Sequence, residues 1–437
     1  MKPTRRQPER GRFVAGVVGG VLAVLLLVIQ PAPLAQRAGG TERWAGTWAT
    51  AAVVRPRPGP ALRGRGGAAQ APLAFHNQTL RQIVRVSVGG ERVRVVLSNA
   101  FGTAPLTVGA AHIALRASEA AIEPGSDRSL TFNGRPGMTI PAGAVAFSDP
   151  VALDMPALSD LAIDLYLPDA VEATTMPFTT HAGALQTSYV SLAGDHTGAA
   201  AMPEATTIRS WFFLARVEVV VPGPTAVLVA FGDSITDGSR STPDTNNRWP
   251  DHVAQRSMAA NARMGVLNAG ISGNRILSDA SSFSALARFD RDVLAATGVT
   301  HVIVLLGTND IGVARENPSP TADDIIGGHR QFIARAHARG LTIYGATLAP
   351  FEGANYWTPE GETKRRVLNE WIRTSGAYDA VIDFDAVVRD PAQPTRLRAE
   401  YDSGDNLHPN DAGYEVMGDA VDLALFTAAQ RPIAAAR

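Results

Sequence analysis

The sequence predicts two folds in one chain, a β-sandwich over residues 41–222 and an α/β domain over residues 223–437. The first part alternates apolar and polar residues with a period of two, as half-buried strands do. The second part has continuous apolar runs separated by helical stretches, which indicates a parallel sheet covered on both faces. The length of 437 residues fits two or three domains, and a composition with 45% hydrophobic and 19% charged residues is that of an ordinary globular protein.

Residues 1–40 are predicted to be a signal peptide or membrane anchor. Basic residues precede an uncharged apolar run over residues 13–29, and small residues follow up to Gly40. This order is typical of an export signal. The run is long for a cleaved signal and short for a spanning helix of about 20 residues, so cleavage and retention both stay open. We expect a secreted or periplasmic protein, or one anchored at the outer face of the cell membrane, which it contacts only through this segment.

The absence of cysteine excludes several classes of protein. Without cysteine there is no disulfide framework, no thiolate-bound zinc, no iron–sulfur cluster and no cysteine nucleophile. The formal net charge of -1 gives no indication of a surface for nucleic acid. We therefore expect no nucleic-acid partner.

Two alternating runs surround Gly89-Gly90 in the β-rich part. Residues 84–88 alternate valine with polar residues before it. After it, Val93, Val95 and Leu97 alternate with Arg92 and Arg94. Because glycine adopts positive φ freely, the pattern predicts a β-hairpin with a two-residue turn. Alternation also predicts strands at residues 161–167 and 216–221, and short strands with Gly/Pro turns favour a jelly-roll-like sandwich.

Proline and glycine mark two boundaries. The stretch over residues 55–72 is predicted to be a loop, and Pro222-Gly223-Pro224 ends the β-rich part. Beyond it, strands are expected at residues 226–231, 266–268, 302–306 and 341–348. Helices are expected at residues 249–263, 283–295, 322–339, 360–375 and 411–425. Strand and helix alternate, which predicts a doubly wound α/β domain.

Polar residues suited to chemistry follow the strands of this domain. The motifs are Gly232-Asp233-Ser234, Gly270 to Asn274, Gly307 to Asp310 and, near the C-terminus, Asp405 to Pro409. Each alone has an ordinary structural explanation, such as a helix N-cap, a turn or a loop. Together they bring a nucleophile, hydrogen-bond donors and an acid–base pair to one edge of one sheet, because reactive groups in such sheets lie past the carboxyl ends of the strands.

The order G-D-S-I, N-A-G-I-S-G-N, G-T-N-D-I and D-x-x-H-P resembles the SGNH (GDSL) hydrolase superfamily, with landmark residues Ser234, Gly273, Asn309 and His408. The chain is similar to a bacterial arylesterase/acylhydrolase-like branch that has an N-terminal β-rich domain. The resemblance implies a flavodoxin-like α/β/α hydrolase domain. The family's usual leucine after the nucleophile is Ile235 here, a conservative change.

The resemblance implies a serine esterase, and the chemistry of the residues agrees. Ser234 is the expected nucleophile, His408 its general base and then acid, and Asp405 the group that orients the imidazole. The backbone N–H groups of Ser234 and Gly273 and the side-chain amide of Asn309 are expected to form the oxyanion hole. Asp233 is expected to fix the turn rather than to react.

Two other kinds of hydrolase are excluded by the sequence. A two-metal phosphoesterase needs several histidines and carboxylates together, and only His408 of the nine histidines is predicted at the rim. An α/β-hydrolase needs a G-x-S-x-G elbow, which neither Ser234 nor Ser272 has. No metal and no cofactor are therefore expected.

The substrate is the less defined part of the prediction. Phe351, Tyr356 and Trp357 follow the fourth strand, and they either line a substrate pocket or pack against the loop of His408. Short acyl or aryl esters are expected, and family analogy adds acetyl groups on polysaccharide. Alternatives are a lipase or lysophospholipase-type acylhydrolase and a catalytically weak carbohydrate-binding protein. His181 and Trp211 are read as core or loop residues.

Overall fold

The computed structural model describes residues 42–55, 74–173, 176–202, 204–312 and 319–427. The predicted signal or anchor over residues 1–40 lies outside this part, and so does the predicted loop over residues 55–72 except for Arg55. No helix in the described ranges has both the length and the apolar character needed to cross a membrane.

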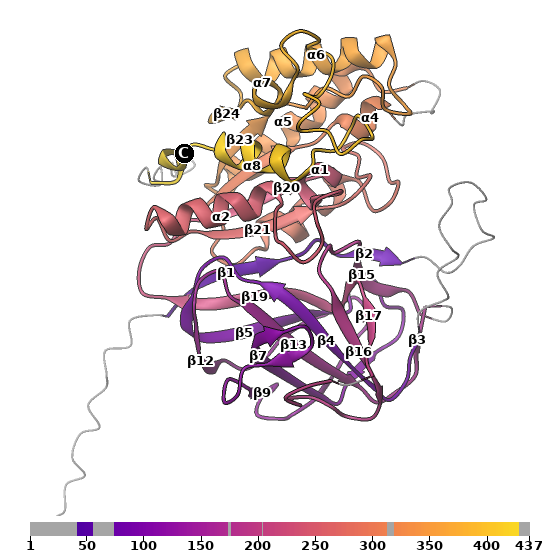
Figure 1. Cartoon of the computed structure of the whole chain (residues 1–437), viewed down its shortest axis with the longest axis vertical. Helices are drawn as coiled ribbons and strands as arrows, with labels where there is room; N and C mark the ends of the chain where they lie inside the picture. The colour runs from indigo at the N-terminus through magenta and orange to yellow at the C-terminus, as the bar shows by residue number, and fades with distance from the viewer. Residues whose placement is uncertain (1–41, 56–73, 174–175, 203, 313–318, 428–437) are drawn as a thin grey trace, which may run out of the picture. The chain divides into compact units, whose positions relative to one another are not determined.

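Two antiparallel sheets make up most of the N-terminal β-rich region (Figure 1). The first has the order β1 (Arg43–Ala49), β19 (Leu214–Val221), β5 (Gly90–Ser98) and β11 (Val145–Phe147), with β12 (Val151–Met155) also on β5. The second has the order β17 (Thr206–Ile208), β16 (Ser188–Ala193), β4 (Gln78–Arg85), β13 (Asp160–Leu167), β7 (Ala110–Ser118) and β8 (Ala121–Ile122), with β9 (Arg128–Leu130) on β7.

Smaller sheets complete this region. They are β10 (Met138–Ile140) with β6 (Leu106–Val108), β14 (Val171–Glu172) with β3 (Ala74–Phe75), and β18 (Ser210–Phe212) with β15 (Phe178–Ala182) and β2 (Val53–Arg55). The expected predominance of strands is confirmed, and the described residues before Pro222 contain no helix. The jelly-roll-like sandwich stays a prediction.

The predicted hairpin around Gly89-Gly90 is wrong. β4 and β5 belong to different sheets, so the two alternating runs do not pair with each other. The chain crosses between the sheets at Ser87, whose backbone N–H donates to the carbonyl of Thr47 over 2.9 Å. Position 89 requires glycine because another segment packs closely against it, and not because of a turn. A Cβ at this position would lie 2.3 Å from the carbonyl oxygen of Met155.

A five-stranded parallel sheet forms the centre of the C-terminal region. Its order is β21 (Gly265–Gly270), β20 (Val227–Gly232), β22 (His301–Leu305), β23 (Thr342–Ala346) and β24 (Ala380–Ile382). Counted along the chain this is 2-1-3-4-5, the flavodoxin-like order, in which ligands bind at the carboxyl ends where the order reverses. Gly232 pairs with both Gly270 and Leu305, so the three segments that follow β20, β21 and β22 leave the sheet at one edge.

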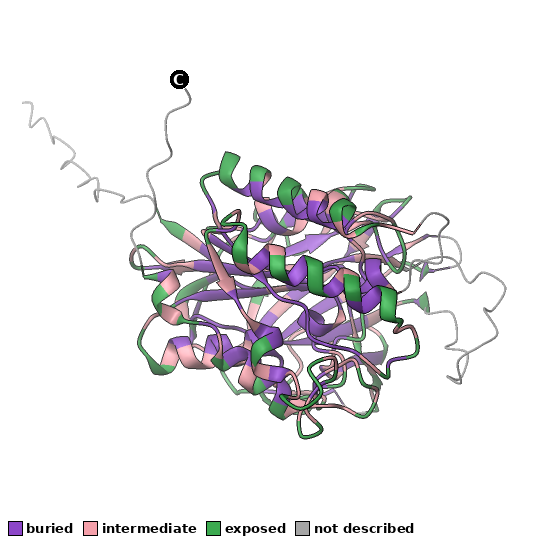
Figure 2. Ribbon diagram, turned by 90° about the horizontal axis from the view of Figure 1, so that it is seen from above, coloured by how far each residue is buried: buried purple, intermediate pink, exposed green. Residues whose placement is uncertain are grey.

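Helices surround this sheet in two groups. They are α1 (Ser234–Asp237), α2 (Trp249–Ala259), α3 (Ala285–Phe289), α4 (Thr308–Gly312), α5 (Ala322–Ala338), α6 (Pro359–Thr374), α7 (Phe384–Val388) and α8 (Asp411–Asp419). α2 packs on α8, and α5 packs on α3 and α6. Their outer faces are exposed and their inner faces buried over buried strands (Figure 2). The last predicted helix is shorter than expected, because it ends at Asp419 and a separate 3₁₀ turn covers Leu423–Phe426.

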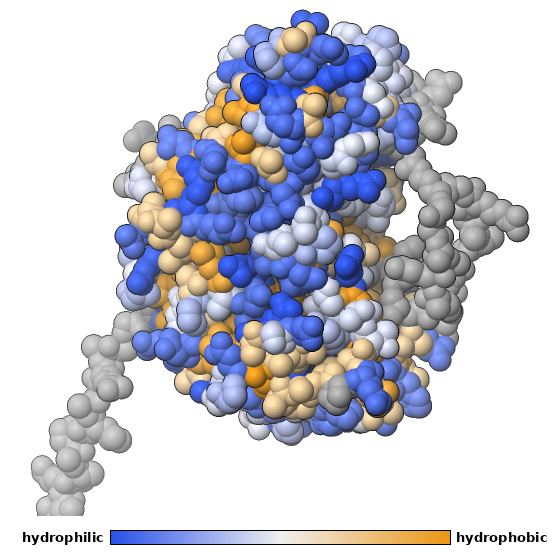
Figure 3. All heavy atoms as spheres, in the orientation of Figure 1, coloured by the Kyte–Doolittle hydropathy of each residue, from blue (hydrophilic) through white to orange (hydrophobic). Residues whose placement is uncertain are grey.

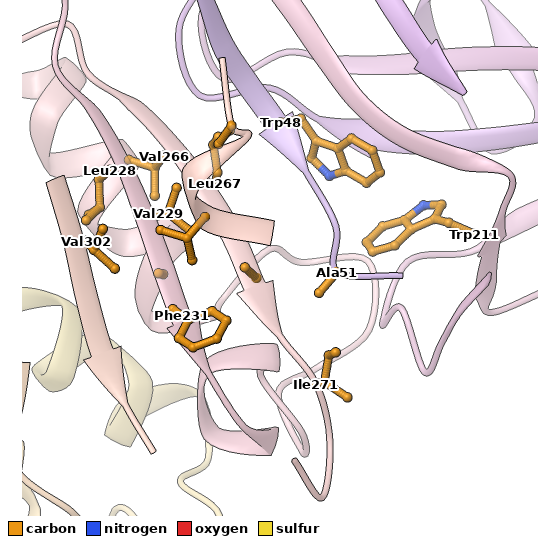
Figure 4. Packing of buried hydrophobic residues seen from close by; sticks show 14 of the residues in the cluster. Trp48, Ala51, Trp211, Leu228, Val229, Phe231, Val266, Leu267, Ile271 and Val302 are labelled. Atoms are coloured by element: carbon orange, nitrogen blue, oxygen red, sulfur yellow. The ribbon is translucent and has the colours of Figure 1, made fainter. Parts of the chain in front are cut away.

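The hydrophobic core runs without a break from the β-rich region into the parallel sheet. Trp48 of β1 meets Trp211 of β18 edge to face, with 5.0 Å between ring centroids, and both lie in the same cluster as Leu267 of β21 (Figure 4). Hydrogen bonds cross the same junction, since the Val266 N–H donates to Ser87 Oγ over 2.9 Å. The domain boundary at residues 222–223 stays a prediction.

Candidate active site

Ser234 stands at the carboxyl end of the first parallel strand. It begins α1, a single turn that directly follows β20 and ends at Gly238 with φ of 94°. The Asp233 side chain caps this turn, because its Oδ1 accepts a hydrogen bond of 3.1 Å from the backbone N–H of Ile235. Asp233 therefore fixes the turn, as expected, and holds the next residue, Ser234, at the sheet edge.

His408 connects Ser234 with Asp405. Its Nε2 lies 2.8 Å from Ser234 Oγ, and its Nδ1 lies 2.8 Å from Asp405 Oδ2. A carboxylate only accepts hydrogen bonds, so Nδ1 carries the proton and Nε2 faces the serine hydroxyl with its lone pair. This is the arrangement in which the ring can take the hydroxyl proton.

The loop of residues 405–408 contributes both the carboxylate of Asp405 and the imidazole of His408. Asp405 Oδ1 accepts hydrogen bonds from the backbone N–H groups of His408 (2.8 Å) and Leu407 (3.1 Å). Burial alone would raise the pKa of Asp405, but these bonds and the His408 side chain lower it to about 2. Asp405 is therefore ionised at neutral pH and can stabilise a charged imidazole.

Gly273 lies in the turn after β21. Its φ of 76° favours glycine, and a Cβ at this position would be 2.5 Å from Ser281 Oγ. The next residue, Asn274, is buried and anchors the turn, since its Nδ2 donates to Ser282 Oγ and to the Phe283 carbonyl, both over 2.9 Å. The turn is thus held on one side by the loop that follows it.

Asn309 is on α4, directly after the third strand of the sheet. It is buried, and its Nδ2 makes a long hydrogen bond of 3.4 Å to Asp233 Oδ2. A side-chain amide carries two N–H groups, so a second donor is left for a ligand. The structure therefore brings Asn309 next to the residue that precedes the nucleophile.

Two buried carboxylates support these segments. Burial is the main cause that raises the pKa of Asp233 to about 7, and the nearby charge of Asp310 adds to it. Burial also raises the pKa of Asp310 to about 6, against the backbone N–H groups of Ile276 and Leu277 that donate to it. Asp310 thereby ties α4 to the loop after Gly273.

Arg288 is a supporting residue that the sequence analysis did not single out. Its fully buried guanidinium donates to the carbonyl of Gly232 (2.8 Å), to that of Ala269 (2.9 Å) and to Asn274 Oδ1 (2.9 Å). It also pairs with Asp292 over 3.0 Å. In the sequence, Arg288 stands between Ala287 and Phe289 in the segment A-L-A-R-F-D-R-D-V-L of a predicted helix, and this apolar context is the observation that could have identified it.

The three aromatic residues after β23 do not behave alike. Phe351 is 1% exposed and packs its ring on Tyr356, so it presents almost no surface, and its place in a substrate pocket stays a prediction. Tyr356 and Trp357 do line a cavity of about 350 Å³, together with Ile311 and Gly312 of the helix that carries Asn309.

Tyr356 lies within electrostatic reach of the catalytic candidates. Burial raises the pKa of its phenol, and the charges of Asp233 and Asp405 raise it further. The indole N–H of Trp357 is buried without a hydrogen-bond partner in the described part of the chain.

The described ranges contain no group of three or more His, Asp or Glu side chains that could hold a metal ion. His408 has both ring nitrogens in hydrogen bonds to Asp405 and Ser234. The chemistry that these residues can perform is proton transfer to and from a hydroxyl.

Comparison with known proteins gives one family. Residues 230–416 match the model of the GDSL-like lipase/acylhydrolase family. No curated protein matches the chain. Similar solved structures include a lipase/acylhydrolase from Enterococcus faecalis, 22% identical, which covers 45% of this chain and 93% of its own with a TM-score of 0.36.

Two other solved structures are similar over the same share of the chain. The aryl esterase of M. smegmatis is 17% identical and covers 45% of this chain and 96% of its own, with a TM-score of 0.37. A carbohydrate acetylesterase family member from Sinorhizobium meliloti is 15% identical and covers 46% of this chain and 97% of its own, with a TM-score of 0.37.

Proposed function

This chain belongs to the GDSL-like lipase/acylhydrolase family, whose members are carboxylic ester hydrolases, and we propose that Ser234, His408 and Asp405 are its catalytic triad. The observation that carries the proposal is the unbroken chain of two hydrogen bonds, each of 2.8 Å, from Ser234 Oγ through the His408 ring to Asp405. Nucleophile, base and orienting carboxylate are thus within direct reach of one another.

The reaction begins when Ser234 Oγ attacks the ester carbonyl carbon and its proton passes to His408 Nε2. The carbonyl oxygen becomes an oxyanion, which accepts from the backbone N–H groups of Ser234 and Gly273 and from the Asn309 amide. The intermediate collapses to an acyl-serine, and the leaving alcohol takes the proton from His408. Water then repeats the sequence, and Ser234 is regenerated with release of the acid.

Asp405 acts on the charge that develops during each proton transfer. Its carboxylate fixes the tautomer of His408 through the Nδ1 hydrogen bond of 2.8 Å and stabilises the imidazolium. Because the pKa of Asp405 is lowered to about 2, the carboxylate keeps its charge at neutral and mildly acidic pH.

The substrate class that we propose is esters of short acyl or aryl groups, including acetyl groups on polysaccharide. The cavity beside Tyr356 and Trp357, about 350 Å³, has room for a short acyl or aryl group. Hydrophobic residues are scattered among hydrophilic ones on the face seen in Figure 3. The exposed large hydrophobic residues of the described part are Val145 and Phe147 of β11, Leu192, Phe283 and Val367.

We also propose that the protein is exported, on the pattern of basic, apolar and small residues over residues 1–40. Fractionation of cells that make the full chain tests this. Protein in the medium, in the periplasm or on the outer face of the membrane supports export, and protein confined to the cytoplasm contradicts it.

The proposed function is tested with 4-nitrophenyl acetate, butyrate, octanoate and laurate as substrates for the full chain. We expect hydrolysis that is fastest with the short esters and is lost in Ser234→Ala. A matched control is Ser257→Ala, which removes from α2 a buried hydroxyl that has no partner among the described residues and should keep full activity. Hydrolysis that persists in Ser234→Ala would exclude the triad, and a folded wild type without any hydrolysis would favour the carbohydrate-binding alternative.

A further inference from the structure

A second histidine–aspartate pair lies behind the candidate active site. His181 of β15, in the β-rich region, has its Nε2 2.9 Å from Oδ1 of Asp237, the last residue of α1. The two side chains are 4% and 6% exposed. Asp237 is only three residues after Ser234, so the pair joins the β-rich region to the turn that carries the nucleophile.

The partners of His181 define its charge. Its Nδ1 lies 2.8 Å from the carbonyl oxygen of Ala51, and its Nε2 faces the Asp237 carboxylate. Both partners only accept hydrogen bonds, so both ring nitrogens must donate and the ring is an imidazolium. Burial alone would lower the pKa of His181, but Asp237 and the Ala51 carbonyl together raise it.

The other oxygen of Asp237 extends the connection to the oxyanion side. Asp237 Oδ2 accepts from Ser272 Oγ over 2.9 Å and from the Ser272 backbone N–H over 3.3 Å. Ser272 directly precedes Gly273, whose backbone N–H is a proposed oxyanion donor. Hydrogen bonds therefore run from His181 through Asp237 to the residue next to that donor.

We propose that His181 is a positioning residue of the active site, which holds Asp237 and through it the Ser272–Gly273 turn in the geometry that binds the oxyanion. The inference rests on the proposed function. An imidazolium suits the task because it donates along two fixed directions, one to each region, and its charge strengthens the hydrogen bond to the Asp237 carboxylate. The β-rich region thus contributes directly to the geometry of catalysis.

The charge of His181 makes the effect dependent on pH. The charged groups that face it are Asp237 and Arg248, and the small cavity beside it is also lined by Arg85 and Asp251. Both ring nitrogens donate to acceptors, and the raised pKa means that the ring loses its proton at a higher pH than an ordinary histidine does. A neutral ring has one N–H for two acceptors, so the hydrogen bond to Asp237 weakens. Because Asp237 positions the Ser272–Gly273 turn, kcat should then fall at alkaline pH.

The first test compares His181→Gln with wild type, and His112→Gln serves as a matched control. His112 also pairs with an aspartate in the β-rich region, 2.9 Å from Asp127, but it lies on β7 and contacts no residue of the site. We expect His181→Gln to lower kcat about tenfold with KM changed less than twofold, because a displaced oxyanion donor costs less than the ~10²-fold of a deleted one. His112→Gln should keep wild-type kcat.

The second test is the pH profile of kcat for wild type, His181→Gln and Ser272→Ala. We expect an alkaline decline in wild type that is absent from both variants, since each cuts the connection at one end. If His181→Gln fails to fold, the pH profile of kcat for Ser272→Ala tests the proposal by itself, because Ser272 is exposed and its substitution should not prevent folding. The same decline in all three proteins, or wild-type kcat in a folded His181→Gln, overturns the proposal.

These outcomes are separate from the test of the proposed function. Activity that is lost in Ser234→Ala but unchanged in His181→Gln overturns only the role of His181. Activity that survives in Ser234→Ala overturns the triad and this inference with it.

Discussion

Two of the histidine–aspartate pairs in the described residues, His408–Asp405 and His181–Asp237, differ in what surrounds them. His408 and Asp405 lie at the rim of the parallel sheet, with side chains 15% and 27% exposed, whereas His181 and Asp237 are almost fully buried. The distances within the pairs are nearly the same, 2.8 and 2.9 Å. What differs is the partner of the second ring nitrogen, a serine hydroxyl in one pair and a backbone carbonyl in the other.

That partner decides whether the ring can exchange a proton. A hydroxyl can donate as well as accept, so a neutral His408 ring can face Ser234 with a lone pair that takes its proton. A carbonyl cannot donate, so His181 holds both protons and serves as a fixed cation. The comparison teaches that a histidine beside an aspartate acts as a base or as a structural cation according to the group that its other ring nitrogen contacts.

The largest expected effect comes from His408→Ala. Removal of the base should lower kcat by on the order of 10⁴-fold or more, while KM changes little, because proton transfer is lost and binding is not. Steady-state kinetics with 4-nitrophenyl acetate measure it. A variant that kept a tenth of wild-type kcat would mean that His408 is not the base. The two histidines would then no longer differ in their roles.

The same protein should remain folded, which separates lost chemistry from lost structure. The His408 side chain is partly exposed and belongs to a short loop, so we expect its truncation to change the midpoint of thermal unfolding by only a few degrees. A large drop in that midpoint would mean that the loop depends on the imidazole for its fold.

Asn309→Ala is expected to have the next largest effect. Loss of one oxyanion donor should lower kcat by about 10²-fold and leave KM nearly unchanged, since the interaction exists only with the charged oxygen. The ratio of kcat to KM effects distinguishes this from a general loss of binding. If kcat were unchanged, the oxyanion hole would consist of backbone groups alone, and the positioning of Gly273 by His181 would matter more.

Much of the α/β region was predictable from sequence because its signals are local. The apolar runs gave the parallel strands, and Ser234, His408 and Asp405 were predicted as neighbours because each follows a strand or precedes the last helix. The structure brings these three into contact. Their roles stay predictions until the variants are measured.

The β-rich region was harder because its partners are distant in sequence. The runs around Gly89-Gly90 have the pattern of a hairpin, yet they belong to two sheets, and alternation does not reveal which strand a strand pairs with. His181 was assigned to the core for the same reason. Its partner, Asp237, is 56 positions away, and no local signal connects them. For Phe351 the sequence left pocket and packing open, because an aromatic residue after a strand has the same local pattern in both.

The buried carboxylate of Asp233 provides a smaller test. Its pKa is raised to about 7, mainly by burial, so the folded state prefers the protonated form. Between about pH 4 and pH 7 the folded state binds more protons than the unfolded state, and stability falls as the pH rises. Relative to Asp233→Asn, wild type should lose up to about 4 kcal/mol of unfolding free energy over this range.

Denaturant unfolding of both proteins at several pH values measures this difference. The asparagine side chain of the variant still has an oxygen to cap α1, and any fixed cost of the substitution cancels because only the change with pH is compared. Asp310 titrates in both proteins, and its effect on the pKa of Asp233 is part of the measured difference. A difference that does not change with pH over this range would mean that burial does not raise the pKa of Asp233.

The smallest expected effect is that of a chelator, which should leave kcat unchanged. Each ring nitrogen of His408 and of His181 is already in a hydrogen bond, to Asp405 and Ser234 in one ring and to Asp237 and the Ala51 carbonyl in the other. A metal would need a free imidazole lone pair, and binding one would break the hydrogen bonds that give each pair its role. Turnover measured before and after dialysis against EDTA tests this, with EDTA-treated Ser234→Ala as the background. Loss of activity that zinc or manganese restored would mean that one of the two rings binds metal, and the distinction between a neutral base and a fixed cation would no longer hold.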